Sequence, residues 1–320
     1  MRNNIKTVAC VGAGLIGQGW ATLFAANGYD VIMQDLSEDR LENATAQVNL
    51  NLTFLENNGR LQKGQATVAY ERIRTILNLA DAVKHADYIQ ESVPDNYPAK
   101  KAVFKEMDAA AASDTILASS SSGMMMTEIQ KAVKRPQRCV LAHPYLPVHL
   151  LPLVEIVGGE QTAPQTVDIT VALMKTLGKT PVRLRKEVSG YIVNRFQAAI
   201  LREAIDLVAS GVASAEEVDS AFCSGMGMRD PFIGPCLRAY LAGDGIEDFV
   251  ESYAESYELR WQSMAAWNTI PAPMREPFIK SVNEMEVLRQ HSLERIKKWR
   301  DKLLVKILKI DRSFTLTDPP

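Results

Sequence analysis

The sequence has few of the residues that form disulfides or bind metals. Its 320 residues include four cysteines and four histidines. The cysteines form no Cys-x-x-Cys pair and lie mostly in apolar runs, which is typical of reduced core thiols. This usage predicts a cytoplasmic protein without a metal centre. The cysteines are Cys10, Cys139, Cys223 and Cys236.

Long apolar runs and an excess of basic charge are also missing. No stretch approaches the roughly 18 apolar residues that span a bilayer. The strand-like run after Met1–Lys6 leads directly into a Gly-rich turn, so we expect no signal peptide. The 36 basic and 38 acidic residues give a formal charge of −2. These features predict neither a nucleic acid nor a membrane as partner.

The first half of the chain alternates short β-like runs with helical patterns. This rhythm is typical of a doubly wound, mostly parallel α/β sheet of the Rossmann type. A helical excursion over Glu38–Asn57 is expected between the second and third of the predicted strands. These strands are Thr7–Val11, Asp30–Gln34, Tyr88–Glu91, Ile116–Ser119, Cys139–Ala142, Leu153–Val157 and Pro181–Leu184.

The second half of the chain has a different pattern, in which nothing strand-rich occurs. Apolar residues recur at helical spacing over Tyr191–Ser210. Ser214 and Glu217 form a capping box that begins the next helix, and the tail is again helical. We therefore expect an α/β domain over residues 1–187 and an all-helical domain over residues 188–320.

A Gly-rich turn follows the first predicted strand and opens a helix. Gly12 permits a tight turn, Gly14 lets the backbone approach a pyrophosphate, and Gly17 lets helix and strand pack closely. The phosphates would meet the helix N-terminus, where free N–H groups favour anions. Asp35, after the second strand, can accept hydrogen bonds from the adenosine ribose and would repel a 2′-phosphate. The motif therefore predicts NAD rather than NADP.

One carboxylate stands in an apolar run that reads as a buried strand. Glu155 is the single charge of Leu151–Val157, and a buried carboxylate requires a partner. His143 follows Cys139–Ala142, at a carboxyl end where open α/β sheets bind ligands. A histidine held by a buried carboxylate is a good general base. The residues alone do not exclude that His143 is a core histidine that lies near Glu155 by chance. They also do not exclude His149 as the histidine of the site.

A run of serines, Ser119–Gly123, leaves another strand end at the same edge of the sheet. Such a run is typical of a polar loop, but it could also line the nicotinamide end of the cofactor. Met124–Met126 comes next, and methionines of this kind more often fill gaps in a core than form a substrate wall.

Further motifs occur in both halves of the chain. In the first half they are Gly12–Gly17 with Trp20-Ala21, Ser119–Gly123, Ala142-His143-Pro144 and Pro152–Glu155. In the second half they are Gly190–Arg195, Gly225–Arg229, Phe232–Pro235 and Trp299-Arg300-Asp301. Together they resemble the 3-hydroxyacyl-CoA dehydrogenase superfamily over nearly the full length, most closely its lambda-crystallin/L-gulonate 3-dehydrogenase branch. L-Carnitine dehydrogenase is a near relative in this resemblance.

The resemblance implies a mechanism for the oxidation of a 3-hydroxyl. His143 would take the proton of the hydroxyl as hydride leaves for the nicotinamide. Glu155, twelve residues further on, would orient His143 and stabilise its cation. Ser122 and Asn194 would hydrogen-bond the reacting oxygen.

The resemblance also implies cofactor contacts beyond the Gly-rich turn. An acid and a lysine that touch NAD in the family fall at Asp95 and Lys100, although relatives usually carry the longer Glu at the first place. Leu146 replaces an asparagine that helps to hold the nicotinamide side, and leucine donates no hydrogen bond. We therefore expect weaker anchoring, a shifted substrate or another polar group there. The predicted NAD contacts are Gly12, Gly14, Leu15, Ile16, Gly17, Asp35, Asp95, Lys100 and Ser122.

The size and charge of the substrate are less directly indicated. The acyl-CoA enzymes of the family carry lysines for the CoA phosphates in the helical excursion, whereas Ala46–Thr53 has none. This absence argues for a smaller substrate. Arg229 could bind the carboxylate of a small acid, or it could form a salt bridge at a helix end or a dimer interface.

The sequence therefore predicts an NAD-dependent dehydrogenase of a small, L-gulonate-like L-3-hydroxy acid, which the resemblance places in a homodimer. Alternative substrates are a 3-hydroxyacyl-CoA such as 3-hydroxybutyryl-CoA, or L-carnitine. An alternative of another class is a non-catalytic NAD-binding structural protein of the lambda-crystallin type. The intact set of Ser122, His143, Glu155 and Asn194 argues against lost catalysis.

Overall fold

The computed structural model describes residues 5–310 of the chain. Its internal contacts divide the chain into two units, Met1–Asn194 and Arg195–Pro320. Within the described residues, no helix is both long and apolar enough to cross a membrane.

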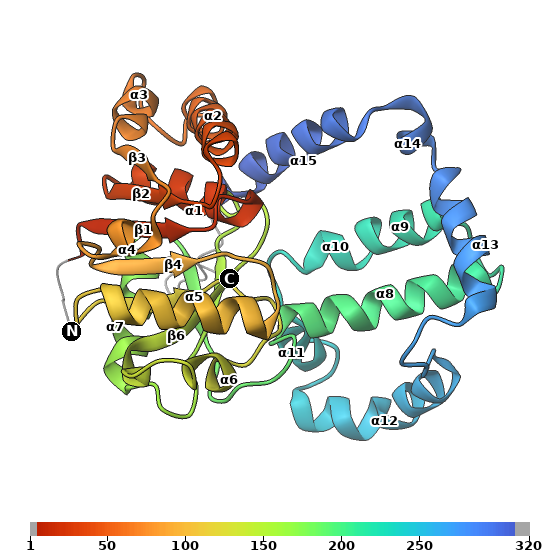
Figure 1. Ribbon diagram of the computed structural model, residues 1–320. Coiled ribbons are helices and arrows are strands. Elements are labelled where there is room, and N and C mark those ends of the chain that lie inside the picture. The colour runs from red at the N-terminus through yellow and green to blue at the C-terminus, as the bar shows by residue number, and fades with distance from the viewer. Residues whose placement is uncertain (1–4, 311–320) are drawn as a thin grey trace. The chain divides into compact units, whose positions relative to one another are not determined.

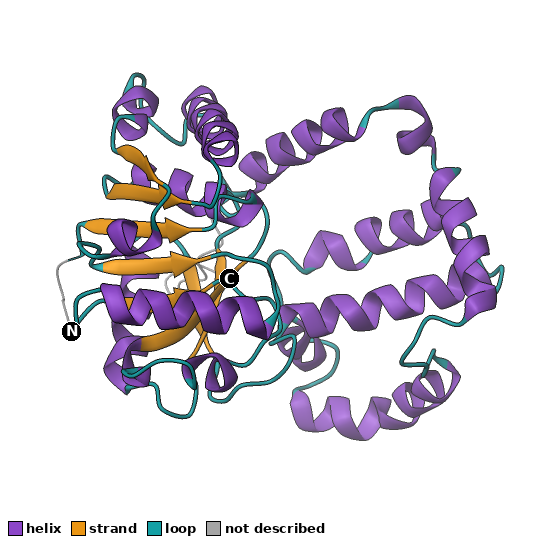
Figure 2. Cartoon of the chain, in the orientation of Figure 1, coloured by secondary structure: helices purple, strands orange, loops and turns teal. Residues whose placement is uncertain are grey.

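The first unit is built around an eight-stranded sheet (Figures 1 and 2). The strand order is β3-β2-β1-β4-β5-β6-β7-β8, and every neighbouring pair is parallel except β6 and β7. This confirms the expected Rossmann-type sheet. The strands are β1 Thr7–Val11, β2 Asp30–Gln34, β3 Ile73–Ile76, β4 Tyr88–Glu91, β5 Ile116–Ser119, β6 Cys139–Pro144, β7 Leu153–Val157 and β8 Thr180–Arg183.

Helices cover both faces of this sheet, and each face has its own apolar core. Along β1, Val8 and Cys10 belong to one core, whereas Ala9 and Val11 belong to the other. This burial on both sides is typical of parallel strands. The helices are α1 Leu15–Ala26, α2 Glu38–Asn57, α3 Gln65–Tyr70, α4 Leu79–Val83, α5 Tyr97–Ala110, α6 Met126–Gln130 and α7 Pro164–Thr176, with a short 3-10 turn over Pro136–Arg138.

Three strand assignments differ from the sequence prediction, and the smallest difference is that β8 covers Thr180–Arg183, one residue earlier than the predicted Pro181–Leu184. The edge strand β3 was not predicted, because it is only four residues long and half of these residues are polar. None of the four is fully buried. Strand β6 extends two residues beyond Ala142, because Pro144 still pairs with Val154 of the antiparallel β7. The same register places His143 directly opposite Glu155.

The second unit contains only helices among its described residues, as Figure 2 shows. The capping box of Ser214 and Glu217 is present at the start of α9. Helix α8 begins at Val193, two residues later than predicted, and its first two residues belong to the first unit. The helices are α8 Val193–Ala209, α9 Ala215–Ser224, α10 Met226–Arg229, α11 Pro235–Tyr240, α12 Ile246–Ser263, α13 Ala272–Asn283, α14 Glu286–Gln290 and α15 Leu293–Ile307.

Candidate active site

The Gly-rich turn between β1 and α1 has the geometry that a bound pyrophosphate requires. Gly12 has φ +94°, and a Cβ atom there would lie 2.8 Å from the Ser92 carbonyl oxygen. A Cβ on Gly17 would lie 1.8 Å from the Gly12 oxygen, whereas one on Gly14 would meet nothing within 4 Å. Gly12 and Gly17 are therefore required by the fold itself. Gly14 faces open space beside the helix N-terminus, where an anion would bind.

A pocket of about 950 Å³ lies at the carboxyl edge of the sheet beside this turn. Its volume is typical of small-molecule sites. Asp35 lines it, and its carboxylate accepts hydrogen bonds from the backbone N–H groups of Ala13 at 2.8 Å and Leu36 at 2.7 Å. Gly17 packs behind the turn instead. The predicted cofactor residues that line the pocket are Gly12, Gly14, Leu15, Ile16, Asp35, Asp95, Lys100 and Ser122.

His143 and Glu155 form a buried pair across the β6–β7 ladder. Nδ1 of His143 lies 3.0 Å from Oε2 of Glu155, and the two residues are 4% and 1% exposed. Oε1 of Glu155 accepts hydrogen bonds from the backbone N–H groups of Ile192 at 2.9 Å and Val193 at 3.0 Å. Burial by itself raises the pKa of Glu155, but hydrogen bonds from His143, these N–H groups and Tyr145 together hold that pKa below its usual value.

The protonation of this pair follows from the ionised carboxylate. Glu155 can only accept, so Nδ1 of His143 carries the proton that is shared between them. The Nε2 atom of His143 is then left with a lone pair. This arrangement can take a proton from a hydroxyl while Glu155 stabilises the resulting imidazolium.

A chain of hydrogen bonds connects this pair to the other predicted catalytic residues. The Tyr145 hydroxyl lies 3.1 Å from Glu155 Oε2 and 3.3 Å from Asn194 Oδ1. Asn194 Nδ2 donates to the Ser122 carbonyl oxygen at 2.8 Å. The structure thus brings His143, Glu155, Asn194 and Ser122 together within the first unit.

The Ser122 side chain has a different partner from the predicted one. Its Oγ–H donates to Asp95 Oδ2 at 2.8 Å, and its backbone N–H donates to the same oxygen at 3.0 Å. A hydroxyl with its proton committed in this way offers only lone pairs to other groups. In this arrangement a donor to the reacting oxygen would have to be Asn194 rather than Ser122.

Leu146 and Arg229 were also singled out in the sequence. Leu146 lines the pocket and is 45% exposed, so the apolar side chain stands where the family asparagine was expected. Arg229 is the last residue of α10 in the second unit and is exposed. It forms no ion pair with any residue that the structure describes. Its role toward the site therefore stays a prediction.

Sequence reasoning missed two residues of this network, Tyr145 and Glu91. Tyr145 had no pattern of its own, because its importance comes from contacts with Glu155 and Asn194. Glu91 is fully buried at the end of β4 and pairs with Lys100. The signal that identified Glu155, a single acid in a buried strand, was present at Glu91 as well.

Known proteins are similar to this chain over most of its length. The family model for the 3-hydroxyacyl-CoA dehydrogenase NAD binding domain matches residues 7–188, and that for its C-terminal domain matches residues 190–278. An L-carnitine dehydrogenase of Burkholderia mallei is 36% identical, with 95% of this chain and 93% of the relative covered. A lambda-crystallin homolog of Homo sapiens is 35% identical, with 95% of each covered.

A solved structure shares both the fold and the length of the chain. The crystal structure of a 5-formyl-3-hydroxy-2-methylpyridine 4-carboxylic acid 5-dehydrogenase, described as an NAD+ dependent dismutase, superimposes with a TM-score of 0.82. The two sequences are 29% identical, and the match covers 96% of this chain and 98% of that one.

Proposed function

Because the chain belongs to the 3-hydroxyacyl-CoA dehydrogenase family, we propose that it oxidises the 3-hydroxyl of a small L-3-hydroxy acid such as L-gulonate. It is an NAD-dependent oxidoreductase with a Rossmann-type domain. The observation that carries the proposal is the buried pair of His143 and Glu155, which supplies a base at the edge of the sheet where the cofactor pocket lies.

In the proposed mechanism, His143 Nε2 accepts the proton of the substrate's 3-hydroxyl. Glu155 keeps the ring in the required tautomer and stabilises its positive charge. Asn194 orients the reacting oxygen, and Ser122 shapes the wall beside it. NAD, which the Gly-rich turn and Asp35 would hold, would supply the hydride acceptor for the carbon that carries this hydroxyl. The product is the 3-keto acid.

The charge of α2 supports a substrate smaller than an acyl-CoA. This helix carries four carboxylates and a single cation, Arg40. A guanidinium nitrogen of Arg40 lies 3.5 Å from Oδ1 of Asp35, so the charge of Arg40 is partly neutralised by this ion pair. A CoA phosphate near α2 would meet repulsion rather than the cationic partners that phosphates require.

L-Carnitine is the second candidate substrate, because the chain is 36% identical to an enzyme named L-carnitine dehydrogenase. Gulonate and carnitine both carry a carboxylate, which Arg229 is proposed to bind. Replacing Arg229 with Met should raise KM for the acid substrate much more than KM for NAD. Equal small effects on both would contradict this role.

The exposed surface of the second unit supports a homodimer. Among its described residues, the buried hydrophobic side chains are only Ile205, Val208, Ala215 and Val305. Large apolar side chains elsewhere on its helices are exposed, which is unusual for a monomer. We assign residues 1–187 to NAD binding and residues 188–320 to substrate binding and dimerisation. We place the protein in the cytoplasm. Sedimentation of the full chain would test the dimer. Among the exposed side chains are Phe196, Ile200, Phe222, Phe232 and Trp261.

One assay separates the possible functions. NADH formation is measured with L-gulonate, L-carnitine, 3-hydroxybutyrate and 3-hydroxybutyryl-CoA, while NAD binding is measured separately. Turnover of a free acid but not of the CoA ester supports the proposal. Preferred turnover of the CoA ester would contradict it. NAD binding without turnover of any of the four would favour a non-catalytic structural role.

A further inference from the structure

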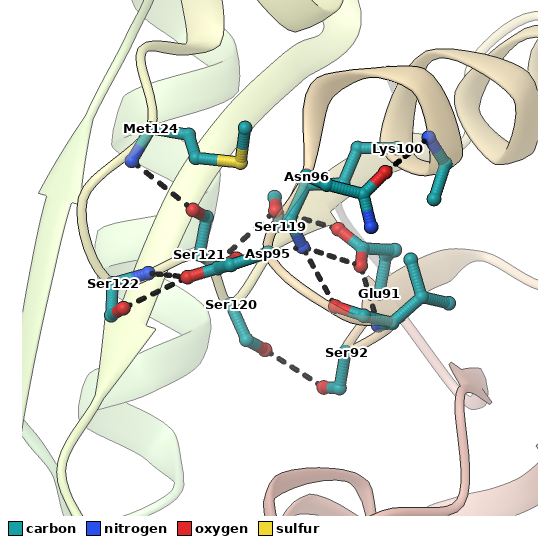
Figure 3. Close-up of polar contacts among 12 residues, drawn as sticks. Glu91, Ser92, Asp95, Asn96, Lys100, Ser119, Ser120, Ser121, Ser122 and Met124 are labelled. Carbon is teal, nitrogen blue, oxygen red and sulfur yellow. Dashed lines mark hydrogen bonds and ion pairs between the residues drawn. The ribbon is translucent and has the colours of Figure 1, made fainter.

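We infer that Lys100 and Glu91 are positioning residues, which act on the nicotinamide end of the NAD site through Asp95 and do not contact the cofactor themselves. Figure 3 shows this cluster at the ends of β4 and β5. The inference rests on the proposed placing of Asp95 and Ser122 in the cofactor site, but it does not depend on the identity of the substrate.

The ammonium group of Lys100 is surrounded by oxygens of the chain itself. Its Nζ atom lies 2.8 Å from Glu91 Oε1, 3.0 Å from the Val93 carbonyl oxygen and 3.2 Å from Asp95 Oδ1. An ammonium group has three N–H donors, and three acceptors are already present. The Lys100 side chain is 1% exposed although the residue lines the pocket. Its charge is therefore directed into the protein.

Glu91 is the buried residue that holds Lys100 in place. Its Oε1 also accepts the backbone N–H of Val93 at 2.6 Å, and its Oε2 accepts the Ser119 hydroxyl at 2.6 Å. One carboxylate thus joins the end of β5, the loop after β4 and, through Lys100, helix α5. Because Glu91 is completely buried, this junction is shielded from solvent, and its hydrogen bonds are strengthened accordingly.

Asp95 is the member of the cluster that faces the pocket. Its side chain is 38% exposed, compared with 1% for Lys100 and 0% for Glu91. One oxygen contacts Lys100 and the other accepts both donors of Ser122. Lys100 thus determines where Asp95 stands, and Asp95 in turn holds Ser122. The wall of the site is positioned by a relay that starts at Glu91.

A double-mutant cycle on NAD affinity tests this order of action. Removing Lys100 alone would leave Glu91 buried and unpaired, which endangers folding. All variants therefore also carry Glu91→Gln. The first protein carries only Glu91→Gln. The second adds Lys100→Met to it, the third adds Asp95→Asn, and the fourth adds both of these changes. The dissociation constant for NAD is measured by calorimetry, so no turnover is needed.

We expect Lys100→Met to weaken NAD binding by roughly tenfold when Asp95 is present and by less than about twofold in the Asp95→Asn background. An equal loss in both backgrounds would show that Lys100 contacts NAD directly. No loss in either would show that the pair is only structural. Lys105→Met is the matched control, because Lys105 is exposed on the same helix, and it should leave the affinity unchanged.

The pH dependence of NAD binding provides a second readout. Burial raises the pKa of Asp95, but the Ser122 N–H, Lys100 and the Ser122 hydroxyl together hold it below its ordinary value. The other groups that face Asp95 are Ser121, Tyr191 and, behind Lys100, Glu91. With Lys100→Met, the loss of affinity should grow as the pH is lowered from 7 to 5. A loss independent of pH would contradict the relay.

These outcomes can be distinguished from a failure of the proposed function. A protein that binds NAD and turns over no hydroxy acid would refute the proposed reaction and leave the relay intact. Conversely, active enzyme with additive losses in the cycle would refute only the relay.

Discussion

Two buried glutamates of the same sheet, Glu155 on β7 and Glu91 on β4, use similar surroundings for different purposes. Each is at most 1% exposed, and each accepts at least three hydrogen bonds. The partner of Glu155 is His143, whose Nε2 is proposed to accept the proton of the substrate. The partner of Glu91 is Lys100, whose three donors are all directed at the chain.

The two carboxylates therefore contribute in different ways. In the proposed mechanism Glu155 must keep its negative charge, because a protonated His143 has to be stabilised during the reaction. Glu91 must keep its acceptors in place, because the position of Lys100 depends on them. Four experiments test this distinction.

The largest effect is expected for His143→Ala. Without the base, kcat should fall by roughly a thousandfold or more, since general base catalysis contributes about 10²–10⁴-fold. NAD affinity should change little, because His143 does not line the cofactor pocket. Steady-state kinetics and calorimetry measure the two quantities. Turnover near the wild-type rate would refute the assignment of the base.

The second-largest effect is expected for Glu155→Gln, with Glu91→Gln as the variant to which it is compared. Glu155→Gln removes the charge that stabilises the His143 cation, so kcat should fall roughly a hundredfold. Glu91→Gln can still accept from Lys100 and Val93, and Ser119 can rotate to accept from the new amide. Its kcat at saturating NAD should stay within about threefold of wild type. Equal losses in the two variants would abolish the proposed distinction.

The third effect concerns stability in acid. The pKa of Glu155 is lowered in the folded state. Its contribution to stability is therefore present above the unfolded pKa of about 4.3 and is lost as the pH falls below that value. Melting temperatures of wild type and Glu155→Gln should differ at pH 7 and converge toward pH 3.5. A constant difference over this range would contradict the lowered pKa.

The smallest effect is expected for Tyr145→Phe. Its hydroxyl is one of four groups that donate to Glu155, and the other three remain. Burial and the nearby charge of Glu155 raise the pKa of Tyr145, so it stays protonated and acts only by hydrogen bonding. We expect kcat to fall by a few-fold, with NAD affinity unchanged. A loss as large as that of His143→Ala would instead make Tyr145 a proton donor or acceptor.

The sequence predicted much of the fold because its signals were local. Helix α2 was predicted with its observed bounds, and the Gly-rich turn was recognised from six consecutive residues. The strand β3 was missed because an exposed edge strand needs no continuous apolar run. The start of α8 was placed too early, because Gly190 and Tyr191 have φ angles of 76° and 49°, which lie outside the right-handed helical region.

The Rossmann-type domain and NAD as cofactor were predicted from the sequence alone, and the sequence also offered a candidate base among its few histidines. These predictions follow from the backbone conformation at Gly12 and Gly17, from the carboxylate of Asp35 and from the rule that a lone buried acid needs a partner. Only the tertiary structure decided which donors each acid receives. Lys100 meets Glu91 because α5 packs beside β5, the neighbour of β4 in the sheet, and His143 meets Glu155 because β7 runs antiparallel beside β6. Such contacts join residues whose separation in the chain says nothing of their distance in space.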